Sequence, residues 1–404
     1  MATNTVSVRC CVAGGGPAGI MLGLLLARAG VDVLVLEKHA DFLRDFRGDT
    51  IHPSTLEVMH ELGLLEDLLK LPHQKAPRLT ARVGGLALTV ADFTHLPTRC
   101  GFIAFMPQWD FLNFLAERSA RYPTFTLRMQ TDVTGLIEEA GGVVGLQATT
   151  PDGPLEVRAN LIVGADGRHS VVRVEAGLKV DEFGAPMDVL WFRLSRRPGD
   201  PEDPVARFEM GRILIMLNRG DYWQCGFVIP KGSFEQLQER GLPAFRDGLA
   251  QLAPFAAARV GEIQNWAALK LLTVQVDRLP RWYRPGLLCI GDAAHAMSPI
   301  GGVGINLAIQ DAIAAANLLA APLRAGRLTT EHLRAVQRRR ELPTRITQRV
   351  QVIVQNRVIK RVLGGGKFSP PFIIRLIARF PFLSRIPARL IGIGFRPEHV
   401  KTPA

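Results

Sequence analysis

The chain has 404 residues, 47% hydrophobic and 21% charged, with a net charge of +12, which suits a folded protein of two joined domains. The five cysteines show no CxxC spacing, so we expect buried free thiols in the cytoplasm and no metal site. We expect neither a signal peptide nor a membrane span, because glycines interrupt the apolar run at 10–29 and no stretch reaches roughly 18 uninterrupted apolar residues.

The N-terminal segment predicts a dinucleotide site. Apolar runs at 6–12 and 31–36 predict two strands, and residues 20–29 predict a helix between them. The turn at 14–19 has GxGxxG spacing, and its candidate cofactor contacts are Gly14, Gly16, Pro17, Ala18 and Gly19. Such glycines allow a tight turn and close backbone approach to a pyrophosphate, which the helix N-terminus attracts. Glu37, followed by Lys38, can accept hydrogen bonds from a ribose diol, which favours FAD or NAD(H) over NADP(H).

Two later segments repeat the pattern of an apolar strand that runs into a glycine-acid turn. The first covers residues 161–170 and contains Asp166, and the second begins at 286 and contains Gly291 and Asp292. Glycine-dense residues 299–306 follow, and a small-residue helix is expected over 307–320. A glycine-dense turn before a helix N-terminus is a site for negative charge.

Residues 176–284 are rich in β-formers. Apolar runs at 188–194 and 212–217 predict strands, and residues 222–230 predict the returning strand of a hairpin whose turn is 219–221.

The positive charge is concentrated at the C-terminus, where residues 334–404 hold 16 Lys or Arg and two acids, Glu341 and Glu398. Charges alternate with apolar residues, as over 371–380, which suits an anionic lipid surface or a partner's apolar groove. A helical pair that packs on its own protein, with its arginines outward, explains the same pattern more simply. A nucleic-acid partner is not expected, because no binding motif accompanies the charge.

Together, the GxGxxG turn with Glu37 and the segments at 164–170 and 291–306 resemble the fingerprints of the class A flavoprotein monooxygenases, relatives of para-hydroxybenzoate hydroxylase. Their order and spacing match over about residues 5–330. The resemblance implies an α/β fold with a Rossmann-type FAD-binding domain, an inserted β-sheet substrate domain and a helical C-terminal tail. The expected boundaries are 1–75, 100–175 and 285–330 for the FAD domain, 76–99 and 176–284 for the substrate domain, and 331–404 for the tail.

The resemblance also assigns roles to individual residues. Arg47 resembles an arginine that contacts the flavin pyrophosphate and ribityl region, and Gln108 resembles a glutamine on the ribityl chain. Asp166 resembles the acid of a motif that serves both FAD and NAD(P)H. The third segment implies ribityl and isoalloxazine contacts from Gly291, Asp292, Pro299, Gly302, Gly304, Ile305 and Asn306. No residue matches a covalent attachment site, so non-covalent FAD is expected.

The middle sheet of the resembled family covers the flavin and holds substrate against it. The candidate pocket residues are therefore Trp191, Arg193, Met216, Tyr222 and Trp223, although alternate residues of any strand also face a core. His52 lies in a loop that passes near the flavin in the family, so it is a candidate catalytic residue that meets substrate or shuttles a proton. An ordinary loop histidine fits equally well. Pro299 is placed against the ring, and His295 is interpreted as structural.

The expected activity is hydroxylation of an aromatic, phenolic or quinone-like substrate, with NADPH or NADH as reductant and dioxygen as oxidant, through a flavin C4a-hydroperoxide. Lipophilicity of the substrate, and peripheral membrane contact of the tail, are hypotheses. The alternatives are a flavin-dependent reductase of a prenyl or polyketide-type substrate and a flavin-containing protein that sequesters a ligand. A flavin-dependent halogenase is disfavoured because its Trp-x-Trp-x-Ile-Pro element is missing.

Overall fold

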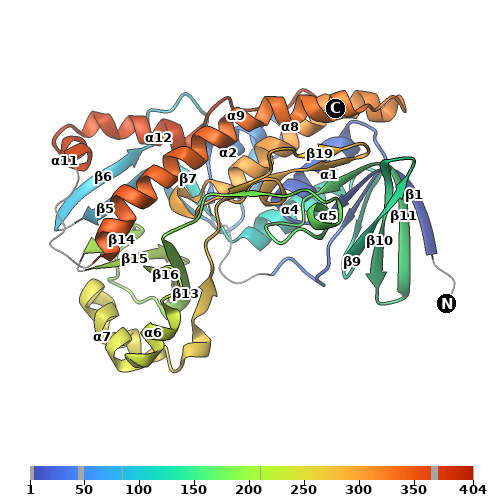
Figure 1. Cartoon of the computed structure of the whole chain (residues 1–404). Helices are drawn as coiled ribbons and strands as arrows, with labels where there is room; N and C mark the ends of the chain where they lie inside the picture. Colours follow the sequence, from blue (N-terminus) through green and yellow to red (C-terminus); the bar gives the residue numbers. More distant parts are fainter. Residues whose placement is uncertain (1–3, 44–49, 84, 210, 365–371, 404) are drawn as a thin grey trace.

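Strands from separated parts of the sequence form one eight-stranded sheet at one end of the molecule (Figure 1). The computed structural model describes residues 4–43, 50–83, 85–209, 211–364 and 372–403. Strands β8, β2, β1, β11 and β20 lie side by side and parallel, in that order, while β19, β10 and β9 join antiparallel. The strands are β1 (Asn4–Ala13), β2 (Val33–Leu36), β8 (Phe125–Arg128), β9 (Asp132–Glu139), β10 (Gly142–Thr150), β11 (Gly153–Gly164), β19 (Tyr283–Arg284) and β20 (Leu287–Cys289).

The apolar C-terminal halves of β1 and β11 are buried because helices cover the sheet. Helix α1 (Pro17–Arg28) is buried from Ala18 to Ala27 and packs against α4 (Gln108–Ser119) and α8 (Gly304–Arg324). Residues 300–324 are long and apolar enough to cross a membrane by length and composition, but most of them are buried inside the protein. We therefore interpret α8 as a core helix. The shorter helices here are α2 (Pro53–Glu61), α3 (Leu65–Leu68) and α5 (Val171–Glu175).

A seven-stranded sheet forms the other part of the molecule, in the order β17-β13-β16-β15-β14-β5-β6. Its bounds are β5 (Arg78–Val83), β6 (Leu86–Asp92), β13 (Met187–Ser195), β14 (Val205–Glu209), β15 (Arg212–Asn218), β16 (Tyr222–Pro230) and β17 (Lys270–Leu272). Two small sheets contain β3 (Thr50–Ile51), β7 (Ile103–Phe105) and β4 (Gln74–Ala76), and β12 (Asp181–Glu182) with β18 (Asp277–Arg278). The expected hairpin at 212–230 is confirmed.

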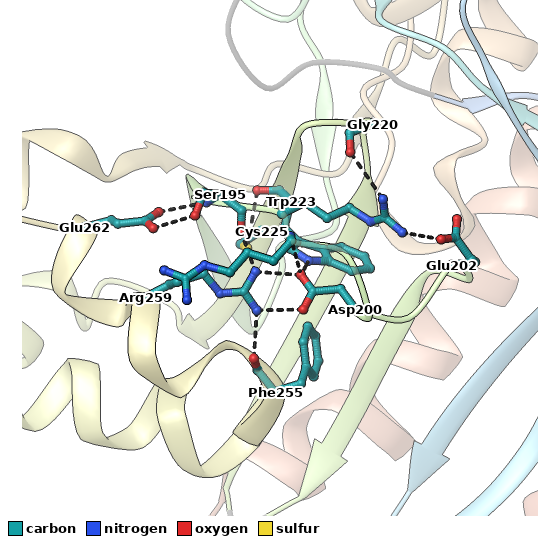
Figure 2. A network of polar contacts seen from close by, with 11 residues as sticks. Ser195, Asp200, Glu202, Gly220, Trp223, Cys225, Phe255, Arg259 and Glu262 are labelled. Atoms are coloured by element: carbon teal, nitrogen blue, oxygen red, sulfur yellow. Dashed lines mark hydrogen bonds and ion pairs between the residues drawn. The ribbon is translucent and has the colours of Figure 1, made fainter.

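Helices α6 (Phe234–Glu239) and α7 (Leu242–Leu252) and the 3-10 helices η1 (Pro254–Glu262) and η2 (Trp266–Ala268) lie against one face of this sheet (Figure 1). A buried ion pair fastens η1 to the loop after β13, because Arg259 donates to both carboxylate oxygens of Asp200 at 2.6 and 2.9 Å (Figure 2). Trp223 Nε1 donates to the same carboxylate at 2.9 Å. These bonds hold the pKa of Asp200 well below its usual range.

The C-terminal region is helical, as expected, and much of it packs on the rest of the chain. Its elements are α9 (Thr330–Val354), the π-helix η5 (Gln355–Ile359), α10 (Lys360–Leu363), α11 (Phe372–Arg379), η6 (Pro381–Ser384) and α12 (Arg385–Gly392). Helix α9 packs along α8, and α11 and α12 pack on β6 (Figure 1). Arg340 departs from the expectation of outward arginines: it is buried and binds Asp311 through Nε at 3.0 Å.

The five cysteines are free and buried, as expected. Burial raises the pKa of the Cys10, Cys225 and Cys289 thiols.

Candidate active site

The three glycine-acid segments begin at neighbouring strand ends. Ala13 at the end of β1 pairs with Gly164 at the end of β11, and Gly164 pairs with Cys289 at the end of β20. On its other side Ala13 pairs with Leu36, the last residue of β2. Parallel strands place their carboxyl ends at one edge of a sheet, where α/β proteins bind nucleotides. The structure therefore brings together the loops that the sequence singled out.

The GxGxxG turn is shaped by its glycines in three different ways. Gly14 has a φ of +105°, and a Cβ there would lie 2.4 Å from the Ala165 carbonyl oxygen. A Cβ on Gly19 would lie 1.9 Å from the Gly14 oxygen, so helix and turn touch. Among the described residues, a Cβ on Gly16 would meet only the Ala165 oxygen, at 4.0 Å, so they leave the space in front of Gly16 open. The N-cap residue of α1 is Gly16, which has no side chain to bind the first-turn amides, so among the described residues these amides are left for an anionic ligand.

Hydrogen bonds hold the Glu37 side chain against the GxGxxG turn. Its carboxylate accepts hydrogen bonds from the Gly15 amide at 3.0 Å and the His39 amide at 3.1 Å. Lys38 is exposed beside it.

The second segment is linked to the third by arginines that sequence reasoning did not single out. Arg168 donates to Asp292 at 3.3 Å, and buried Arg173 donates to the Ala293 carbonyl at 3.2 Å. Asp166 Oδ2 accepts from the Val172 amide at 3.1 Å, whereas its buried Oδ1 has no hydrogen-bond partner among the described residues. Burial raises the pKa of Asp166.

Gly291 is enclosed between two helices, which explains why the third segment needs a glycine there. Its φ is +60°, and a Cβ would lie 3.3 Å from Ala18 in α1 and 3.2 Å from Ala308 in α8. Its amide donates to Asp311 at 3.2 Å. His295, interpreted from sequence as structural, is buried and binds the same carboxylate at 2.6 Å.

The buried Asp311 carboxylate lies at the centre of a network under the third segment. Burial alone would raise the pKa of Asp311, but His295 and Arg340 outweigh it and hold that pKa below its usual range. Arg340 also binds Glu398, so the network extends to the C-terminal residues.

Residues 299–306 are joined to the loop that contains His52. Thr50 Oγ1 donates to the Gly302 carbonyl at 2.8 Å. Asn306 Oδ1 accepts from the His52 amide at 2.9 Å and from Thr55 Oγ1 at 2.7 Å, while Nδ2 donates to the Thr50 carbonyl at 3.1 Å. Asn306 Nδ2 also donates to the Gly302 carbonyl at 3.4 Å, so the Asn306 side-chain amide forms all four of its hydrogen bonds.

The Asn306 side chain therefore positions the two loops. A cofactor contact from this residue would use its backbone, together with Gly304 and Ile305, because the N-cap residue Val303 makes no side-chain bond to the first-turn amides of α8. The adjacent 3-10 helices are η3 (Gly291–Ala293) and η4 (Ile300–Gly302), with Pro299 preceding η4.

His52 precedes α2 and is fully buried. Its Nδ1 lies 2.8 Å from the Ile391 carbonyl oxygen in α12. Burial lowers the pKa of His52 to about 4.

Of the two remaining flavin candidates, Gln108 and Arg47, the structure describes only Gln108. Gln108 is the first residue of α4 and is partly exposed. Nearby, burial raises the pKa of Asp110 while the charge of Arg219 opposes the rise. Arg47 lies outside the described residues.

The face of the seven-stranded sheet opposite α7 carries three of the five pocket candidates. Trp191 lies across Gly226 and belongs to the same apolar cluster as Ile300 of the glycine-dense loop. Arg193 stacks over the Tyr222 ring at 4.7 Å.

Met216 and Trp223 are corrected by the structure, because they point to the opposite face. Both are buried in the cluster that packs against α7 and η1, and Trp223 contacts the Phe255 ring at a centroid distance of 5.7 Å. Successive residues of a strand alternate between faces, so Tyr222 and Trp223 cannot share one pocket.

An open cavity of about 560 Å³ lies elsewhere, between β5, β6, β14 and the α11–η6 segment, and none of the candidate residues that the structure describes line it. Within the described ranges, no group of three or more His, Cys, Asp or Glu side chains could hold a metal ion.

The strand-end loops, the open space at Gly16 and the two uncapped helix N-termini fit an FAD molecule, whose pyrophosphate and flavin edge both need amide donors. The chain matches the family described as FAD binding domain over residues 7–350 and belongs to that family, the class A aromatic hydroxylases. It is an FAD-dependent monooxygenase.

Two curated relatives and one solved structure illustrate the range of this family. The chain is 35% identical over 397 residues to the 6-methylpretetramide 4-monooxygenase of Streptomyces rimosus, covering 97% of this chain and 94% of that protein. It is 30% identical over 317 residues to the dialkyldecalin synthase of Streptomyces rugosporus, covering 75% of this chain and 63% of that protein. The anhydrotetracycline hydroxylase structure from Streptomyces rimosus superposes with a TM-score of 0.75 at 25% identity, over 96% of this chain and 76% of that one.

Proposed function

We propose that this chain uses NAD(P)H and dioxygen to hydroxylate a phenolic or quinone-like ring of a polycyclic, polyketide-type substrate. The observation that carries this proposal is the contact between the glycine-dense loop at 299–306, which follows the strand ends that fit FAD, and the seven-stranded sheet. Ile300, next to Pro299, packs in one cluster with Trp191 of β13. The similarity to a 6-methylpretetramide 4-monooxygenase along almost the whole chain supports the substrate class.

We propose that FAD is held without a covalent bond by backbone groups of the α1 and α8 N-termini, with Glu37 at the ribose and Asp292 at the ribityl chain. Lys38, Arg47, Gln108 and Asp166 are retained as further contacts. When bound, FAD supplies the redox chemistry between NAD(P)H, dioxygen and substrate.

The chain's own residues bind and orient the substrate and exclude water. The proposed substrate contacts are Arg193, Tyr222 and His52, with Pro299 at the loop between substrate and cofactor. The Arg193–Tyr222 stack presents a cation and a ring, which suits a flat hydroxylated aromatic ring.

The test is rapid mixing of purified holoenzyme. Anaerobic reduction of the flavin by NADPH or NADH is followed by absorbance with phenols, naphthols and 6-methylpretetramide, and products are then analysed after addition of ¹⁸O₂. Faster flavin reduction with one substrate, and a product that gains one ¹⁸O atom, are expected. Substrate conversion without oxygen uptake would instead favour the reductase.

The similarity to a dialkyldecalin synthase calls for one further control, a reaction without NAD(P)H. Product formation without NAD(P)H would point to non-redox chemistry of the kind that the name dialkyldecalin synthase suggests. Tight ligand binding with no turnover under any condition would favour the sequestering protein.

We also propose peripheral contact of the tail with an anionic bilayer. The exposed side chains that support it are Phe372, Phe380, Phe382, Ile386, Arg375, Arg379, Arg385 and Arg389. Aromatic and cationic groups together favour the interface of anionic lipid. Sedimentation with vesicles of phosphatidylglycerol and phosphatidylcholine should be lost in Phe382→Ser with Ile386→Ser and retained in Leu271→Ser, an exposed apolar control. Failure of the unmodified protein to sediment would refute this contact.

A further inference from the structure

Gln351 of α9 binds the backbone on both sides of Pro299. Its Oε1 accepts a hydrogen bond from the Ser298 amide at 3.2 Å. Its Nε2 donates to the Ser298 carbonyl at 2.9 Å and to the Ile300 carbonyl at 2.9 Å. Gln351 is only 4% exposed, so water hardly competes for these three bonds. One buried amide therefore fixes residues 298–300, which lead into the glycine-dense loop.

The helical segment that contains Gln351 continues to the seven-stranded sheet (Figure 1). Beyond α9, Ile359 of η5 and Val362 of α10 are buried in one apolar cluster with Val228 of β16, and Ile300 packs against that cluster. The connecting element η5 is a π-helix, a rare form that is frequent at functional sites. Residues 351–362 therefore hold both the loop and the sheet, and so fix the distance between them.

We propose that Gln351 is a positioning residue that sets the gap between the bound flavin and the substrate-facing sheet. The proposal rests on the proposed function, in which Pro299 lies between substrate and cofactor, and it goes beyond that function by naming what fixes the gap. Oxygen transfer depends on the separation and alignment of the reacting atoms, and a misplacement of about 1 Å can cost roughly a hundredfold in rate. Gln351 acts on this geometry through the backbone of residues 298–300 and needs no contact with either ligand.

The first variant is Gln351→Met, because methionine has a similar length and no amide. The change removes three bonds from the Ser298 and Ile300 backbone while it keeps the interior of the protein filled. In the FAD-bound enzyme, the Ser298 amide should exchange with deuterium about tenfold faster or more. The ratio of hydroxylated product to oxygen consumed should fall, and kcat/KM for hydroxylation should decrease about tenfold or more.

Gln348 provides a matched control one turn earlier on the same face of α9. It is buried, and its Nε2 donates to the Asp277 carbonyl at 2.6 Å and to the Ala296 carbonyl at 3.1 Å. Its Oε1 accepts from Arg278 at 2.8 Å. Gln348→Met thus also removes three bonds, but none of them to residues 298–300. It should lower Tm about as much as Gln351→Met does and retain the unmodified ratio of product to oxygen.

A milder change keeps the test informative if Gln351→Met does not fold. Gln351→Asn retains an amide that is too short to reach all three backbone groups, so its ratio of product to oxygen should lie between those of Gln351→Met and the unmodified enzyme. Gln348→Asn is its control and should keep the unmodified ratio.

The experiment compares these holoenzymes by hydrogen exchange, thermal unfolding and the ratio of product to oxygen. A lower ratio in the Gln351 variants alone, with faster exchange at Ser298, is the expected result. Equal losses of ratio in the Gln348 variants would show a general effect of packing and overturn the proposal. Unchanged exchange at Ser298, or an unchanged ratio despite faster exchange, would overturn this inference while the hydroxylase function stands. An unmodified enzyme that hydroxylates no aromatic substrate would overturn the proposed function, and this inference with it.

Discussion

Gly14 and Gly16 are two residues apart in the GxGxxG turn but have different roles. Gly14 is required by the protein, because its φ is +105° and the Ala165 carbonyl would lie 2.4 Å from a Cβ. Gly16 has room for a methyl group, so the space in front of it serves something other than the fold. The same motif therefore contains one structural glycine and one glycine that we assign to the ligand.

This difference gives a prediction for the two alanine variants. Gly16→Ala should leave the free energy of unfolding of the flavin-free protein within about 0.5 kcal/mol of the unmodified value, and weaken FAD binding by about tenfold or more. Gly14→Ala should lose more than about 1 kcal/mol of stability even without FAD. Flavin fluorescence titration and urea unfolding measure the two quantities. Gly261→Ala, with nothing within 4 Å of its added Cβ, is the control. Unchanged FAD affinity in Gly16→Ala would remove its assignment to the cofactor.

His52 makes stability depend on pH in a defined direction. Its pKa is lowered by burial to about 4, so the unfolded chain takes up this proton first as the pH falls below about 6.5. Uptake by the unfolded state favours unfolding, and stability is lost between pH 6.5 and 4. Over that window the unmodified protein should lose roughly 3 kcal/mol relative to His52→Gln. Urea unfolding at intervals from pH 7 to 4 checks this, and parallel curves for the two proteins would contradict it.

At the scale of elements, the seven-stranded sheet separates two environments. One face is a closed core against α7 and η1, and the other carries Trp191 and approaches Ile300. The Asp200–Arg259 pair fastens the closed face, with Arg259 only 2% exposed and bonded also to the Ser195 and Phe255 carbonyls (Figure 2). We expect this network to maintain the sheet and to have no direct contact with FAD.

Removal of one charge of the Asp200–Arg259 ion pair should lower the free energy of unfolding. Asp200→Asn leaves the Arg259 charge buried and poorly compensated, and we expect a loss of about 3–5 kcal/mol in the free energy of unfolding. The double variant with Arg259→Met should lose less than the sum of the two single losses, because no unpaired charge remains. Urea unfolding of the four proteins at pH 7 measures the coupling, and strictly additive losses would be inconsistent with a coupled ion pair.

The same sheet shows which features the sequence could and could not predict. The strand ends with their glycine-acid turns were predictable, because each is a local pattern and parallel strands align such ends. The face of β15 that meets substrate could not be predicted, because Ile213 and Leu214 are both buried and buried residues do not alternate with exposed ones along this strand. The hydrogen bonds from His52 to Asn306 and to Ile391 join residues hundreds of positions apart, and no local pattern reports them.

At the scale of the whole molecule, the C-terminal residues tie several helices of the FAD-type half together. Glu398 binds Arg340, which binds Asp311, which holds the Gly291 amide. Beyond Glu398, the Val400 amide donates to Glu61 of α2 at 2.8 Å, and the Lys401 amide donates to Asn317 of α8 at 2.8 Å. A chain of buried charges therefore runs from the tail to the third FAD-type segment.

Removal of residues 395–404 should consequently affect both stability and the cofactor. Loss of Glu398 leaves Arg340 with the single carboxylate of Asp311, and we expect unfolding free energy to fall by about 3 kcal/mol or more. FAD affinity should fall as well, because Asp311 would no longer hold the Gly291 turn as firmly. Glu398→Gln should reproduce part of both effects, whereas Lys401→Ala, whose bond to Asn317 uses the backbone, should reproduce neither. Thermal unfolding and flavin titration of the three variants decide the matter: a truncated chain that melts and binds FAD like the full chain would show that the buried network under Gly291 is maintained without the tail.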